Sequence, residues 1–323
     1  MVTKSLSLIS LVSVLLVCAV VGFIAISSPL NPIKRFITTR LFGKPVPSDA
    51  VYKNVIFDLN GVLFEISKNK ALSHLGFLDT INYIFSGKKP DDLQNKMFDI
   101  LCSMRQENPE KLALKASGDI LVPMHKDRVL PKIFCDWMKG IISTEEITKQ
   151  THNKLDTLSD DYYSSKLEKR LIRKIAGMMF DPALRCKLYK PITKNIKLLK
   201  KCKKLGLKTY LLSNMDTQLI ELLQAKHPEI FGLFDGIVIS ADVKMMKPHT
   251  NIYAHALNEF GLNPYESCFI DDEQMNVAGA QQSGITAIQF DGEKPKETRK
   301  QLVAIGVLPT QTRNDKKHAV TVL

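Results

Sequence analysis

The sequence lacks the cysteine spacing that would indicate a disulfide framework or a cysteine-based metal site. Its six cysteines include no CxxC pair, and the five that follow residue 100 are an odd set with irregular spacing. Such a set is typical of free thiols in a reducing compartment. We therefore expect these five cysteines to be small buried hydrophobic residues.

The chain also lacks internal repeats and low-complexity tracts. With 323 residues, it is long enough for one or two domains, and 45% of its residues are apolar. This composition supports a real hydrophobic core and excludes a repeat architecture.

Charge is absent from Ser5 to Ile26, a run that is long enough to cross a bilayer. A secretory signal peptide has a shorter apolar region of about 7–15 residues. We therefore predict that residues 1–28 form a single-pass transmembrane anchor. Removal of the segment as a signal peptide, followed by secretion, is the alternative.

The charges that flank this segment predict its orientation. One lysine precedes the segment, and several basic residues follow it closely. They are Lys34, Arg35, Arg40 and Lys44. Because basic residues stay on the cytoplasmic side, we expect a membrane protein whose large C-terminal part is cytoplasmic.

Acidic residues are outnumbered, and the net charge is +12, with a dense basic block from Lys194 to Lys208. This block contains no aromatic residue on which a base could stack, so we expect no nucleic-acid partner. A solvated helix face is the expected role of the block. Contact with anionic lipid head groups is the alternative.

The rest of the chain changes its pattern twice. A proline-punctuated linker covers residues 29–50, and the apolar stretch that ends at Asp58 predicts a strand. Residues 69–189 have helical periodicity, with no convincing strand and an extra helical element expected around 106–130. In this stretch, Ser143 or Thr144 is expected to cap a helix, with Glu146 available to reach back.

Strands and helices then alternate to the end of the core. Strands are predicted at 207–213, 235–240, 267–271 and 285–290, and helices at 193–204, 216–226, 250–260 and 274–283. This order predicts an α/β fold, in which a doubly wound, Rossmann-like parallel sheet receives an inserted all-helical cap. The core is thus 51–68 and 190–309, the cap is 69–189, and 310–323 is a tail.

Polar residues follow four of the predicted strands. In such folds, ligands bind beyond the carboxyl ends of the strands. The residues at these ends are Asp58, Ser213 with Asn214, Lys247, and the pair Asp271–Asp272. A carboxylate can attack phosphorus, carboxylates can hold Mg²⁺, and lysine can neutralise phosphoryl charge. The set is suited to phosphoryl transfer.

The same residues lie in four motifs, "FDLNGVL", "LLSNMD", "KMMKPHTNIYAHAL" and "CFIDDEQMNVAGAQQSGI". Together these motifs strongly resemble the haloacid dehalogenase-like hydrolase superfamily over residues 51 to about 290. The match is nearest to the subgroup of epoxide-hydrolase N-terminal and sugar-1-phosphatase-like sequences. The resemblance implies a Mg²⁺-dependent phosphatase that acts on a small phosphorylated metabolite through an aspartyl-phosphate.

The resemblance also implies a role for each motif residue. Asp58 would be the nucleophile and a metal ligand, and the backbone carbonyl of Asn60 would be a second ligand. Ser213 and Asn214 would hold phosphate, and Lys247 would orient the nucleophile and the phosphate. Asp271 and Asp272 would complete the metal site, at least one of them directly. The helical insert would close over the site and select the substrate.

Asn60 departs from the pattern of most phosphatases in this superfamily, which have a second aspartate there as general acid and base. Three interpretations remain open. The first is a phosphatase with a good leaving group, such as a sugar 1-phosphate. The second is a haloacid dehalogenase. Dehalogenases of the superfamily need no Mg²⁺ and lack the acidic pair, so Asp271–Asp272 argues against this interpretation. The third is a weakly active domain that serves as a membrane-tethered binding module.

Overall fold

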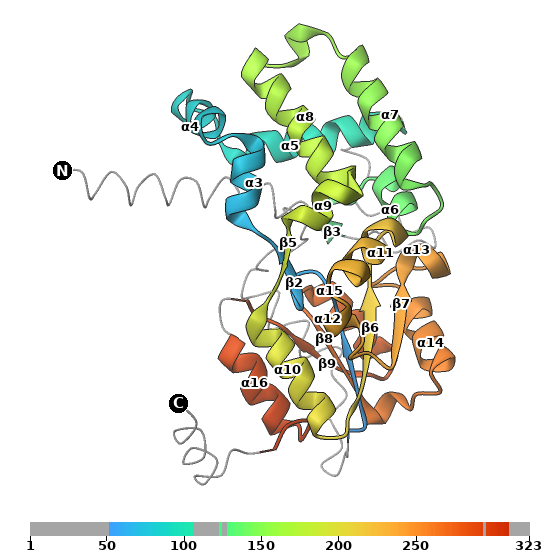
Figure 1. Ribbon diagram of the computed structural model, residues 1–323. Coiled ribbons are helices and arrows are strands. Elements are labelled where there is room, and N and C mark those ends of the chain that lie inside the picture. Colours follow the sequence, from blue (N-terminus) through green and yellow to red (C-terminus); the bar gives the residue numbers. More distant parts are fainter. Residues whose placement is uncertain (1–51, 106–122, 125–127, 293–294, 310–323) are drawn as a thin grey trace, which may run out of the picture.

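The core is built on one five-stranded parallel sheet with strand order β7-β6-β1-β8-β9. The computed structural model describes residues 52–105, 123–124, 128–292 and 295–309 (Figure 1). The five strands are β1 (Asn54–Phe57), β6 (Lys208–Ser213), β7 (Gly236–Ile239), β8 (Ser267–Asp271) and β9 (Thr286–Gln289). The predicted α/β class and the five predicted strands are confirmed, each within a few residues.

Both faces of this sheet are buried, because alternate residues of each strand belong to different hydrophobic clusters. In β1, Val55 and Phe57 pack on one face, and Ile56 packs on the other. Helices α14 (Thr250–Glu259) and α15 (Gln274–Gln282) cover the face of Ile56. Helices α10 (Thr193–Lys204) and α16 (Pro295–Ala304) cover the opposite face. The doubly wound arrangement follows from these two apolar layers.

Three further helices complete the core near the site edge of the sheet. They are α11 (Thr217–Lys226), α12 (Pro228–Phe231) and α13 (Ser240–Val243). Asp216 caps the first of them by accepting a hydrogen bond from the backbone N–H of Leu219 at 2.9 Å. Because this cap lies three residues after Ser213, it fixes the turn by which β6 leaves the sheet.

The cap is helical and lies beyond the carboxyl ends of the strands (Figure 1). Its helices are α3 (Lys68–Leu75), α4 (Phe77–Phe85), α5 (Pro90–Ser103), α6 (Lys132–Met138), α7 (Thr144–Thr157), α8 (Lys166–Phe180) and α9 (Pro182–Leu188). Trp137 is buried among Phe134 and Phe180, with its ring centroid 5.2 Å and 5.1 Å from theirs. The cap therefore has an aromatic core of its own.

An antiparallel pair of strands joins cap and core. The chain enters the cap through β2 (Phe64–Ile66) and returns through β5 (Tyr189–Pro191), with Ile66 opposite Tyr189. Both crossings between the two parts therefore run side by side, next to the turn that follows Asp58.

The prediction of an all-helical insert is wrong in one place. Strands β3 (Pro123–Met124) and β4 (Arg128–Val129) form an antiparallel pair where an extra helical element was expected. Strands of two residues are too short to show an alternating pattern in a sequence. The rest of the predicted element, at 106–122 and 125–127, lies outside the described residues.

Within the described residues, no helix is long and apolar enough to cross a bilayer. The predicted anchor at Ser5–Ile26, the linker at 29–50 and the tail at 310–323 lie outside the described part of the chain. All five described cysteines are free thiols, as expected, and four of them are buried, whereas Cys135 is half-buried.

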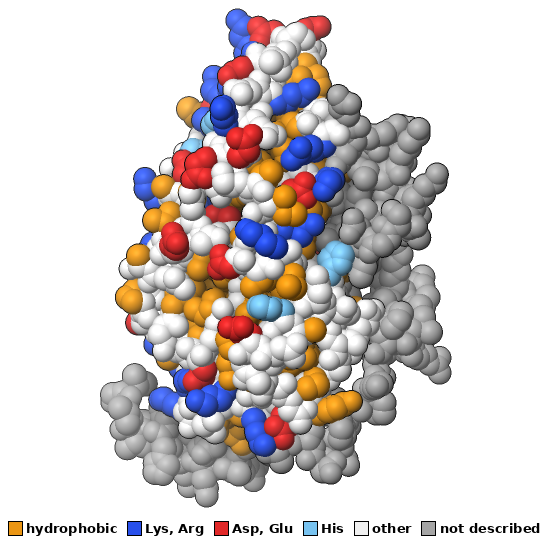
Figure 2. Space-filling model, turned by 90° about the vertical axis from the view of Figure 1, so that its right-hand side faces the viewer, with side chains coloured by type: hydrophobic (Ala, Val, Ile, Leu, Met, Phe, Trp, Pro, Cys, Tyr) orange, Lys and Arg blue, Asp and Glu red, His pale blue; other side chains and the backbone are white. Residues whose placement is uncertain are grey.

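Basic and acidic side chains are interspersed on the face shown in Figure 2, with apolar side chains between them. The positive net charge therefore does not form a continuous basic surface on that face.

Candidate active site

The residues predicted from four strand ends converge on Lys247. Its ammonium group donates hydrogen bonds to Asp58 and Asp271, each at 2.6 Å, and only 1% of the residue is exposed. Asp58 follows β1 and Asp271 ends β8, and these two strands are neighbours in the sheet. Parallel neighbours bring their carboxyl ends to one edge, so residues far apart in sequence meet there.

The position of Lys247 is fixed by its surroundings. Its ammonium group also donates to the carbonyl oxygen of Leu212 at 3.0 Å. The side-chain amide of Asn214 binds the lysine's main chain twice, because it donates to the Lys247 carbonyl and accepts from the Lys247 N–H, both at 2.9 Å. The ammonium group therefore has three acceptors, which offset the cost of burying its charge.

Asp271 is saturated with donors. It accepts hydrogen bonds from Lys247, from the backbone N–H of Glu273 at 2.8 Å, and from the Asn276 amide at 3.0 and 3.1 Å. Tyr253 in turn holds the Asn276 carbonyl at 2.7 Å. We infer that Asp271 mainly orients Lys247.

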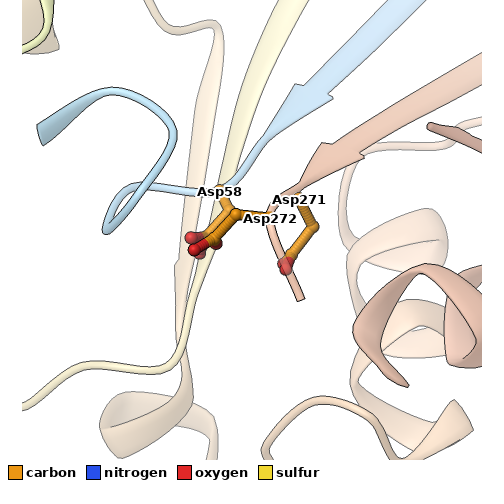
Figure 3. A group of neighbouring side chains, drawn as sticks. All are labelled: Asp58, Asp271 and Asp272. Atoms are coloured by element: carbon orange, nitrogen blue, oxygen red, sulfur yellow. The ribbon is translucent and has the colours of Figure 1, made fainter. Parts of the chain in front are cut away.

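Asp272 is placed differently. No residue of the described chain donates a hydrogen bond to its carboxylate, which lies against Gly61, and a Cβ added at Gly61 would stand 2.1 Å from an Asp272 oxygen. Gly61 also has a φ of +82°, a conformation that glycine tolerates best. One carboxylate oxygen from each of Asp58, Asp271 and Asp272 lies within 4.8 Å of the others, so the three could contact the same ion (Figure 3).

The site holds more buried carboxylates than cationic side chains. Burial raises the pKa of Asp58 to about 7, although the Lys247 charge opposes this rise. Burial and neighbouring carboxylates hold the pKa of Asp272 and of Glu273 well above the usual range. Burial would lower the pKa of Lys247, but Asp271 and Asp58 outweigh it and raise the value to about 12. One lysine thus faces a surplus of carboxylates, which a divalent cation would balance.

The donor set fits Mg²⁺. The cation prefers hard oxygen ligands and is usually bound by one or two protein carboxylates. Asp58 and Asp272 offer oxygens that are not saturated by hydrogen bonds, whereas Asp271 has little capacity left.

Of the three residues predicted to bind phosphate, Ser213, Asn214 and Lys247, Ser213 has a hydroxyl with no hydrogen-bond partner in the described part of the chain. This hydroxyl is fully buried. A buried hydroxyl without a partner is costly unless a ligand satisfies it. The side chain of Asn214 is bound to the main chain of Lys247. Asn214 could therefore contact phosphate only through its own backbone N–H.

Three features of the site were not predicted from the sequence. They are the saturation of Asp271, the use of Asn214 to hold Lys247, and the contact of Gly61 with Asp272. A signal existed for Gly61 alone, since a glycine after a strand-end acid often marks a close approach.

Comparison with known proteins is consistent with this geometry. A family model described as haloacid dehalogenase-like hydrolase matches residues 52–284. The chain is 32% identical over 101 residues to a sesquiterpene phosphatase of Aspergillus oryzae, across 31% of this chain and 51% of that protein. It is 30% identical over 95 residues to (S)-2-haloacid dehalogenase 4A of Burkholderia cepacia, across 29% of this chain and 40% of that protein.

These alignments span about half the length of the curated relatives or less. A solved structure with a similar arrangement is a HAD family enzyme of Bacteroides thetaiotaomicron in complex with magnesium and inorganic phosphate. It is 19% identical, with a TM-score of 0.44, across 74% of this chain and 94% of that chain.

Proposed function

Because the chain belongs to the haloacid dehalogenase-like hydrolase family, we propose that it is a Mg²⁺-dependent phosphatase of a small phosphorylated metabolite. The observation that carries this proposal is the joining of Asp58 and Asp271 through Lys247, with Asp272 beside them. An aspartate that only capped a turn would need neither a buried lysine nor the neighbouring acidic pair, Asp271–Asp272.

The reaction has two displacements. A carboxylate oxygen of Asp58 forms a bond to phosphorus while the bond from phosphorus to the substrate's ester oxygen breaks. That oxygen takes a proton from solvent and leaves as an alcohol. Water then attacks phosphorus and frees Asp58, so the products are the alcohol and inorganic phosphate. The charge of Lys247 favours the ionised form of Asp58, against the effect of burial, and its 2.6 Å hydrogen bond aligns the carboxylate.

The remaining residues hold the phosphoryl group and the metal. The Ser213 hydroxyl can donate to a phosphoryl oxygen, and the Asn214 N–H can supply a second donor. Mg²⁺, held by Asp58, Asp272 and the carbonyl of Asn60, would neutralise the charge that develops on the phosphoryl oxygens.

Asn60 limits the substrate class. An amide cannot protonate a leaving oxygen at neutral pH, and such help is typically worth about 10²–10⁴-fold. Substrates whose alcohol leaves readily, such as a sugar 1-phosphate, therefore suit this site best. Prenyl phosphates are a second class to test, since one relative is a sesquiterpene phosphatase.

Carbon–halogen hydrolysis is the second candidate, because another relative is a haloacid dehalogenase. In that reaction, Asp58 would displace halide from carbon, and no metal would be needed. The cluster of Asp58, Asp271 and Asp272 favours the phosphatase. A weakly active domain that binds a partner is the third candidate.

One experiment separates the three. The purified chain is assayed for phosphate release from nitrophenyl, sugar and prenyl phosphates, and for halide release from 2-haloacids, each with Mg²⁺ and with a chelator. Mg²⁺-dependent phosphate release supports the proposal, and metal-independent halide release supports the dehalogenase. If neither product forms, the chain is not a hydrolase of these substrates, and the binding module becomes the better explanation.

A further inference from the structure

The cap carries a large groove that is not lined by the residues around Asp58. It has a volume of about 1030 Å³ and lies along α7 and α8, with α9 at its base. A smaller groove of about 540 Å³ shares His74 and Leu184 with it, so the two grooves are neighbours. We call the two together the cap groove.

The cap groove has a surplus of positive charge. Nine lysine and arginine residues line it, against two acidic residues, Glu145 and Asp181. Three further carboxylates at its rim, from Asp79, Asp156 and Asp160, pair with four of the nine cations. The other five cations have no carboxylate partner in the described part of the chain. They are Lys70, Lys149, Lys166, Lys187 and Lys226.

Helix α4 adds exposed apolar side chains at the rim of the groove. Phe77 is 43% exposed, Leu78 is 72% exposed and Phe85 is 82% exposed. Asp79 ties the helix to α8 through hydrogen bonds from Arg170 Nε at 3.0 Å and from Lys174 at 3.2 Å. The helix projects sideways from the cap, away from the sheet (Figure 1). Side chains of this size rarely stay in water without a function when several gather together.

We propose that this face of the cap, the cap groove together with α4, docks on a lipid bilayer that contains anionic phospholipids. Leu78 and Phe85 enter the interface between head groups and acyl chains, and the five lysines that have no carboxylate partner in the described part of the chain attract head-group phosphates. Two of these lysines, Lys70 and Lys226, also donate to main-chain carbonyl oxygens. A bilayer uses both features at once, since apolar insertion and basic attraction add in interfacial binding. A polypeptide that is acidic and has no apolar side chains would use the lysines but would leave Phe85 in water.

Docking is tested by placing a fluorescent reporter on α4 of the full chain. The only native tryptophan, Trp137, is 1% exposed and gives a constant background. In Phe85→Trp, we expect emission to shift to the blue and to be quenched by brominated lipids when vesicles contain phosphatidylserine. Vesicles of phosphatidylcholine alone should produce little change, and high salt should reverse the effect. The matched control is Tyr265→Trp, at a position that is 57% exposed in the core.

The contribution of charge is measured on the same reporter. Lys149→Gln and Lys166→Gln should each weaken binding to phosphatidylserine vesicles by about fivefold, because each basic residue near a charged surface contributes about that factor. Lys300→Gln, on an exposed helix of the core, should leave binding unchanged. Because the reporter is local, insertion of the segment 5–26 into any vesicle does not imitate the result.

Three outcomes would overturn the proposal. The emission of Phe85→Trp could be the same with and without phosphatidylserine, or the Tyr265→Trp control could respond equally. A shift with soluble polyglutamate and none with vesicles would assign the groove to an acidic polypeptide instead. None of these results depends on phosphatase activity, so the proposed function stands or falls separately.

Discussion

Asn60 is the residue at which the chain departs most from a complete phosphatase site. We predict that Asn60→Asp accelerates hydrolysis of alkyl phosphates by about 10²-fold, because it adds a group that can protonate the leaving oxygen. The gain should be small for nitrophenyl phosphate, whose leaving group needs little protonation. Steady-state kinetics on both substrates measures the difference. An equal gain on both would show that Asn60 limits some other step.

Gly61 offers a matched pair of substitutions. Gly61 and Gly87 have nearly the same φ, +82° and +81°, but a Cβ at Gly61 would meet Asp272, whereas nothing lies within 4 Å at Gly87. Gly87→Ala should lose roughly 1 kcal/mol of unfolding free energy through the left-handed backbone. Gly61→Ala has the same backbone cost and must also displace the Asp272 side chain. Only Gly61→Ala should also weaken Mg²⁺ binding, as measured by calorimetry. Equal Mg²⁺ affinity in both variants would place the metal away from Asp272.

The sequence identified which residues meet at the site, but it could not assign every contact. Strand-end positions placed Asp58, Lys247 and Asp271 at one edge, because parallel strands share their carboxyl ends. The functions of Asn214 and Asp271 depend on the hydrogen bonds that their side chains already make to neighbouring loops. Those bonds join residues that are distant in sequence, and no local pattern encodes them.

At the scale of elements, prediction worked where apolar residues were numerous. The core strands were found because each is a short buried apolar run between helices, as in β1. The pairs β2–β5 and β3–β4 were missed because strands of two or three residues have no visible period. Their pairing depends on tertiary contacts between distant segments.

The sequence predicted one helix N-terminus of the cap domain correctly. Ser143 caps α7 by accepting from the backbone N–H of Glu146 at 3.1 Å. Ser143→Ala should therefore cost about 1 kcal/mol of unfolding free energy in urea denaturation. Ser67 precedes α3 without such a bond, so Ser67→Ala is the control and should cost clearly less. Equal losses would mean that the Ser143 bond adds nothing in solution.

At the scale of the molecule, we expect the acidic cluster to couple folding to metal binding. A ligand that binds only the folded state at a hundred times its dissociation constant adds about 2.7 kcal/mol of stability. For a domain of this size, we expect Mg²⁺ to raise the melting temperature by about 5–10 °C. Differential scanning fluorimetry with Mg²⁺ and with chelator measures the shift. Asp272→Asn should abolish most of it, whereas a full shift in that variant would remove Asp272 from the metal site.

The proposed reaction depends most on covalent chemistry at Asp58, and trapping the intermediate tests this step directly. The chain is mixed with a phosphorylated substrate and Mg²⁺, quenched in acid and reduced with borohydride, which converts a phosphorylated aspartate to homoserine. Peptide mass spectrometry should find homoserine at position 58, and only when both Mg²⁺ and substrate were present. Phosphate release with Asp58 unmodified under every quench condition, or undiminished turnover by Asp58→Asn, would contradict the proposed reaction.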